Sequence, residues 1–100
     1  MKPPKEIKVG GHRYKVVYND PSIRYSDNLK GYHDPNYKII KVDPGLPTES
    51  DKTEVLIHEV LHAINYVYLA NEITEKELDA LGQGVFQVLS DLGLEIDWKN

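Results

Sequence analysis

Two patterns of hydrophobic and polar positions follow one another along the chain, and they change over near residues 44–47. Before this point, β-branched and aromatic residues alternate with charged ones, which is the period expected of half-buried strands. After it, apolar residues recur at every third or fourth position, which is helical spacing. Strands followed by helices predict an α+β fold, in which a small N-terminal sheet of three or four strands packs on a central helix and a C-terminal helix.

Two hairpins are predicted in the first half of the chain. One pairs residues 7–9 with residues 14–18 across a Gly-Gly turn, and the other pairs residues 30–33 with residues 37–42 across an Asp-Pro-Asn turn. A single two-stranded hairpin is only marginally stable in water. We therefore expect both hairpins to share one sheet.

Two helices are predicted in the second half. Residues 51–54 have the spacing of a capping box and precede a helix over residues 55 to about 70, with Asn71 as the residue that ends it. A second capping box begins at Thr74 and opens a helix that runs to about Leu92. The first helix is apolar on nearly every side, which predicts that it lies between the sheet and the second helix.

The 100 residues suit one domain, spanning residues 1–100. The absence of cysteine excludes disulfides, cysteine-ligated zinc, iron–sulfur clusters and a cysteine nucleophile. No apolar run approaches the ~18 residues of a membrane span, and the N-terminus has no signal-peptide core. We expect a cytoplasmic protein without a membrane partner.

Charge is unevenly distributed between the two halves. Residues 1–47 hold nine Lys or Arg and five Asp or Glu, whereas residues 48–100 hold three and eleven. The basic residues alternate with apolar ones instead of clustering, which suits the exposed faces of strands. No nucleic-acid partner is therefore expected.

The pattern His58-Glu59-Val60-Leu61-His62 lies within the first predicted helix. Residues four apart lie one above the other on a helix, so both imidazoles can bind one zinc ion. Glu59 then lies beside the ion, where it can act as general base toward a zinc-activated water. Three fixed residues at this spacing would arise by chance roughly 0.01 times in such a chain, which favours a metal site over two buried core histidines.

A catalytic zinc needs a third protein ligand, and no third histidine follows the motif. Acidic residues at the start of the second helix supply the candidates: Glu75, Glu77 and Asp79. Glu77 is the natural capping partner of Thr74, so a simple cap is the better interpretation for it. We favour Glu75 as ligand, with Asp79 accepting a hydrogen bond from a ligand imidazole, although Asp79 remains open as the ligand itself.

The choice of Glu75 carries a structural condition. In an ideal antiparallel helix pair, a residue near 82 would lie opposite His62. Glu75 is then expected to reach the metal only if the first helix ends early, around Tyr66, or if the helices cross steeply. Asn65 and Tyr66 follow His62 on nearly the same face and either support the site or belong to the core.

The motif together with the downstream Glu75 and Asp79 resembles the gluzincin branch of the zincin metallopeptidases. The segment is similar to the third-ligand helix of thermolysin-like enzymes and, more distantly, to that of ImmA/IrrE-type peptidases, which have Asn at the position of Asp79. The chain as a whole resembles small HEXXH proteins of phages and prophages. The resemblance implies a minimal zincin fold encoded by a phage or mobile element.

This resemblance also implies how a peptide or protein substrate would bind. In zincins an edge strand above the helix pairs with the extended substrate, and residues 37–42 or 30–33 are the candidates here. His33 and Tyr32 could donate to the oxygen that develops charge, although a turn histidine and a packed tyrosine are the simpler interpretation.

The sequence thus predicts a zinc-dependent peptidase of narrow specificity. His58, His62 and Glu75 are the expected zinc ligands and Glu59 is the expected general base. One alternative is a non-catalytic regulatory or binding module in which zinc staples the helices together. Another is a purely structural protein whose two histidines belong to the core.

Overall fold

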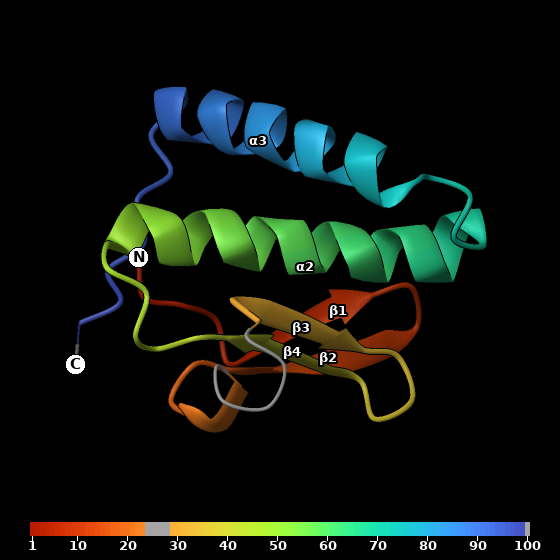
Figure 1. The fold of residues 1–100 in the computed structure, drawn as a ribbon, viewed down its shortest axis with the longest axis horizontal. Helices are drawn as coiled ribbons and strands as arrows, with labels where there is room; N and C mark the ends of the chain where they lie inside the picture. The colour runs from red at the N-terminus through yellow and green to blue at the C-terminus, as the bar shows by residue number, and fades with distance from the viewer. Residues whose placement is uncertain (24–28, 100) are drawn as a thin grey trace.

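The structure is a computed structural model, and it describes residues 1–23 and 29–99. A four-stranded sheet precedes two long helices, and α2 lies between the sheet and α3 (Figure 1). The elements are β1 (Glu6–Val9), β2 (His12–Val17), β3 (Gly31–Asp34), β4 (Ile39–Val42), α2 (Glu49–Leu69) and α3 (Glu75–Asp91). The predicted α+β architecture is confirmed.

Both predicted hairpins are present and they share one sheet of strand order β1-β2-β4-β3. Within each hairpin the strands are antiparallel, whereas β2 and β4 pair in parallel and join the two hairpins. The predicted strand over residues 37–42 begins too early, because Tyr37 and Lys38 belong to the turn and Lys38 adopts a left-handed φ of 57°. In this order β3 is the last strand and pairs with β4 alone, so it is an edge strand of the sheet.

The main core fills the space between the sheet and α2. Strand side chains such as Tyr14, Ile40 and Val42 are fully buried there against Leu56 and Ala63 of α2. The alternation of apolar and charged residues along the strands explains this arrangement, because every second side chain points to one face of a sheet. On its other side α2 is covered by α3, whose buried residues are Leu78 and Gly82.

The start of α2 differs from the sequence prediction. The helix begins earlier than expected because Thr48 caps it: the Thr48 hydroxyl accepts a hydrogen bond from the Asp51 backbone N–H at 3.0 Å. Thr53, which the predicted capping box placed at the helix start, is buried inside the helix. Its hydroxyl donates to the Glu49 carbonyl and accepts from the Trp98 indole N–H at 2.9 Å.

The connection between the two helices matches the prediction more closely. The α2 helix ends in the left-handed residues Ala70 and Asn71, with φ of 51° and 60°, and Asn71 is the residue predicted to end it. The α3 helix opens with the predicted capping box between Thr74 and Glu77. Within the described residues, no helix is long and apolar enough to cross a lipid bilayer.

Candidate metal centre

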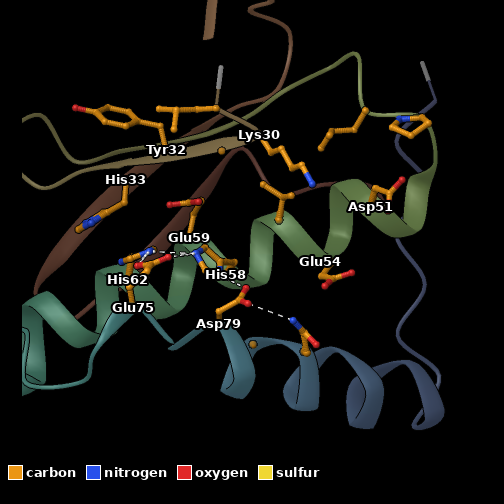
Figure 2. Close-up of a pocket in the computed structure, with 17 residues that line it drawn as sticks. Lys30, Tyr32, His33, Asp51, Glu54, His58, Glu59, His62, Glu75 and Asp79 are labelled. Carbon is orange, nitrogen blue, oxygen red and sulfur yellow. Dashed lines mark hydrogen bonds and ion pairs between the residues drawn. The ribbon is translucent and has the colours of Figure 1, made fainter. Parts of the chain in front are cut away.

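The two histidines of the motif lie one turn apart on α2, and their side chains point to the same place (Figure 2). The Nε2 atoms of His58 and His62 are 3.1 Å apart. Both side chains are partly buried, with exposures of 20% and 29%. Burial lowers the pKa of His62 more than the nearby Glu75 raises it, which favours the neutral imidazole that a metal requires.

Glu75, the first residue of α3, completes a three-residue cluster with these histidines. Its Oε1 lies 3.2 Å from His58 Nε2 and its Oε2 lies 3.0 Å from His62 Nε2. Potential ligand atoms of the three residues all lie within 4.8 Å of one another, and no other cluster of this kind occurs in the described part of the chain. His58, His62 and Glu75 thus form a triad that could hold a metal ion.

The donor set of this triad fits zinc chemistry. Ligands at about 2.0–2.1 Å in a tetrahedron are separated by roughly 3.3 Å. The two histidine Nε2 atoms are 3.1 Å apart, and they lie 3.2 Å and 3.0 Å from the two different oxygens of Glu75, so all three side chains approach one point. Two imidazole nitrogens and one carboxylate also leave a fourth tetrahedral position without a protein ligand. This is the arrangement of catalytic zinc sites, whereas structural sites use four protein ligands.

Glu75 reaches the histidines without either of the conditions expected from the sequence. The α2 helix continues past Tyr66, and the two helices run side by side without a steep crossing (Figure 1). A Cβ built on Gly82 would lie 3.8 Å from the Cα of His58, so Gly82 lies opposite His58 instead of His62. The α3 helix is therefore shifted by about one turn relative to an ideal hairpin, and this shift brings Glu75 to the site.

Hydrogen bonds from Asn65 to the turn before α3 are associated with this shift. Its side chain makes two hydrogen bonds with the backbone of Ile73 and holds the interhelical turn back against α2. Asn65 is buried, and both ends of its side-chain amide bond to the turn that leads into α3. Only its position three residues after His62 hinted at this, because its partner is a backbone group that no sequence motif identifies.

Asp79 lies one turn along α3 from Glu75. Its Oδ1 is 3.6 Å from Nδ1 of His58, the ring nitrogen that does not face the triad. This distance is too long for the expected hydrogen bond, so Asp79 lies beside the ring without bonding to it. Glu77 instead accepts hydrogen bonds from both the backbone N–H and the hydroxyl of Thr74, which lower its pKa and identify it as a cap.

Glu59 lies on the side of α2 that faces the sheet. It is 7% exposed and occupies a space that Gly31 of β3 leaves open, because a Cβ on Gly31 would lie 2.9 Å from Oε2 of Glu59. Burial, assisted by the negative charge of Glu75, raises the pKa of Glu59 to about 8. A carboxyl group with such a pKa both accepts and donates a proton near neutral pH.

His33 hangs from β3 above His62 in Figure 2. Its ring lies nearly parallel to that of His62, with centroids 6.4 Å apart, and its Nε2 is 3.2 Å from the hydroxyl of the buried Tyr14. Burial lowers the pKa of His33 and raises that of Tyr14, so both groups favour their neutral forms. The neighbouring Tyr32 is 42% exposed.

The triad and Glu59 line a groove of about 880 Å³ between β3 and the two helices. One wall is the edge strand, with Gly31, Tyr32 and His33, and the other wall includes Asp79 and Gln83 of α3. Of the two segments considered for pairing with a substrate, only residues 30–33 border the groove, because β4 lies inside the sheet.

The comparisons with known proteins leave the family open. No family model matches the chain, and no curated protein or solved structure is significantly similar to it. The sequence resemblance to zincins therefore stands on the motif itself. The structure adds a compact α+β fold in which a His-His-Glu triad, with one ligand from a second helix, could bind a metal ion.

Proposed function

We propose that the protein is a zinc-dependent peptidase of narrow specificity. The observation that carries this proposal is the position of Glu59, a buried carboxyl group beside an open His-His-Glu triad on the floor of a groove. A purely structural metal site has no use for a carboxyl group that is buried at a cost and forms no ion pair with any residue that the structure describes. A general base, by contrast, gains from this environment.

The residues take the following roles. His58, His62 and Glu75 hold zinc, which supplies a Lewis acid and lowers the pKa of water. Glu59 removes a proton from the attacking water and donates it to the departing amine, which its raised pKa allows. Asp79 beside His58 Nδ1 holds that imidazole in orientation.

The edge strand β3 is the element that binds the substrate. One side of β3 pairs with β4, and the strand borders the groove that contains the triad. An extended peptide can add to such an edge by main-chain hydrogen bonds, which would carry its backbone past the triad. The groove is bounded by few elements, and this favours a narrow range of substrates.

A Glu59→Gln variant tests the proposal. Removal of a general base lowers the rate by about 10²–10⁴-fold, whereas the three ligands and the fold stay intact. Hydrolysis of a quenched-fluorescence peptide library and of casein by zinc-loaded protein measures the activity, and metal analysis of untagged protein measures zinc content. Equal activity in both proteins, or zinc lost from the variant, would contradict the assigned role.

A second function is favoured by the thin packing of α3. Leu78 and Gly82 are the only buried residues of this helix, so a metal that links Glu75 to α2 would staple α3 in place. A zinc-stapled binding or regulatory module would use β3 to capture a partner without cleaving it. Its partner affinity would survive Glu59→Gln, whereas the turnover of a peptidase would not.

A further inference from the structure

We propose that Asn65 is a positioning residue that places Glu75 in the metal site, so that a side chain outside the ligand set controls the affinity for zinc. The inference rests on the metal site of the proposed function and is independent of whether a peptide is cleaved. It answers a question that the ligands leave open: why α3 is shifted by the one turn that the triad requires.

Asn65 forms hydrogen bonds to three residues of the turn between the helices. Its side-chain amide donates to the carbonyl of Ile73 at 3.0 Å, and its Oδ1 accepts from the N–H of Ile73 at 3.1 Å. Its backbone carbonyl accepts from the N–H groups of Ala70 and Asn71. With 5% of its surface exposed, Asn65 satisfies both its side-chain donor and its acceptor on one distant residue.

The turn needs this support because only one of its two left-handed residues, Asn71, suits that conformation. Ala70 and Asn71 are both left-handed, and alanine is disfavoured in that region by its Cβ. No glycine is available in residues 70–74 to relieve the strain. The two bonds from Asn65 therefore select the conformation that runs back along α2.

The two hydrogen bonds from Asn65 to Ile73, called the clamp below, determine the position of Glu75. Glu75 comes two residues after Ile73, and its side chain is 67% exposed, so no core packing fixes it. Among its neighbours in the first turn of α3, Leu78 alone is buried. Without the clamp, α3 can slide toward an ordinary hairpin register, in which Glu75 lies beyond the reach of the histidine pair.

The test compares two buried polar residues of α2 that each hold another segment. Asn65→Ala removes the clamp on Ile73, whereas Thr53→Ala removes the hydroxyl that holds Trp98 at the other end of the helix. Titration with zinc against a chromophoric chelator gives the dissociation constant of each variant. We expect Asn65→Ala to weaken zinc binding by about 10–100-fold and Thr53→Ala to change it by less than about twofold.

A double-mutant cycle shows whether Asn65 acts through Glu75. Glu75→Ala removes the third ligand, so adding Asn65→Ala to it should weaken zinc binding no further. Fully additive losses would overturn the inference, because they would mean that Asn65 acts on the histidines. Equal losses in Asn65→Ala and Thr53→Ala would also overturn it, because general destabilisation would then explain both.

Two further outcomes separate this inference from the proposed function. If Asn65→Ala fails to fold, Asn65→Asp keeps the acceptor for the Ile73 N–H, and circular dichroism like that of the wild type with zinc binding weakened at least about threefold supports the inference. Unchanged binding in Asn65→Asp overturns it. Wild-type protein that takes up no zinc overturns both proposals, whereas zinc uptake without peptide cleavage removes only the peptidase.

Discussion

The two sides of α2 are built differently. On the side that faces the sheet, Leu56 and Ala63 are buried within the main core, and Glu59 is buried beside them where it lines the groove. On the side that faces α3, the neighbouring helix buries Leu78 and Gly82, and the Glu75 side chain is two-thirds exposed. The proposed base is therefore enclosed between α2 and the sheet, whereas the third ligand is held by a turn and by one thin interface.

This difference indicates how a small domain can build a metal site. The two histidines need only a helix, and their spacing along it is enough to bring them together. The base needs a low-polarity environment, which the sheet supplies, and the third ligand must arrive from a separate element. The α3 side is therefore the part of the site that metal binding would stabilise most, since it has the least packing of its own.

The largest expected effect on the free energy of unfolding comes from a substitution on the sheet side of α2. Ile40→Ala removes a fully buried side chain from β4 and should lower the free energy of unfolding by about 2–5 kcal/mol, measured by chemical denaturation. Val88→Ala on the outer face of α3, where the residue is 58% exposed, should change it by less than about 0.5 kcal/mol. A cost at Val88 as large as that at Ile40 would show that the outer face of α3 is covered in solution.

Replacing a glycine by alanine should lower the free energy of unfolding on the sheet side of α2, and should leave it unchanged or raise it on the α3 side. A Cβ on Gly31 would clash with Val55 Cγ1, so Gly31→Ala should cost about 1–3 kcal/mol of unfolding free energy. Adding Val55→Ala removes that clash, and the double variant should lose less than the sum of the two single ones. Gly84→Ala on α3 meets no atom within 4 Å and should be neutral or stabilising by up to about 1 kcal/mol. A neutral Gly31→Ala would contradict the close approach of β3 to α2.

The pH dependence of the stability of the metal-free protein reports on Glu59, which lies on the sheet side of α2. The pKa of Glu59 is raised to about 8, so the folded state keeps a proton that the unfolded state has lost, and stability falls as the pH rises toward 8. His33 and His62 have lowered pKa values, so they cost stability only below their ordinary pKa near 6.5. Between pH 6.5 and 8 we expect a loss of the order of 1–2 kcal/mol in the presence of chelator. Glu59→Gln should abolish this slope, and a slope that persists would place its origin in another group.

The fold was largely predictable because its signals are local. Alternating strands, the Gly-Gly turn, the Asp-Pro-Asn turn and the capping box at Thr74 each depend on residues close in sequence, and each is present in the structure. The start of α2 was missed although its signal is also local, because two overlapping cap patterns lie there and the prediction used the later one. The predicted capping box used Asp51 and Glu54, whereas the helix is capped by Thr48, whose hydroxyl accepts from the Asp51 N–H three residues later.

The candidate site also has a part that local spacing predicts and a part that depends on the tertiary structure. His58, Glu59 and His62 lie on one helix, so their relation could be read from spacing alone. The proximity of Glu75 depends on a one-turn shift of α3, and this shift is associated with two side-chain bonds from Asn65 to the backbone of Ile73. A register between two helices is a tertiary property, and helix geometry alone predicted the wrong one.

The smallest expected effect lies on the α3 side, at Asp79. Its carboxylate is 3.6 Å from His58 Nδ1, and Asp79→Asn removes the negative charge that favours the ligand orientation of the ring. We expect zinc binding to weaken by about tenfold, the lower end of the range for groups that support metal ligands. Asp91→Asn at the far end of α3 changes the net charge of the chain equally and serves as the control. Similar losses in both variants would mean that the total negative charge of α3, and not the contact with His58, attracts the ion; a loss confined to Asp79→Asn would extend the site one turn further along the weakly packed helix.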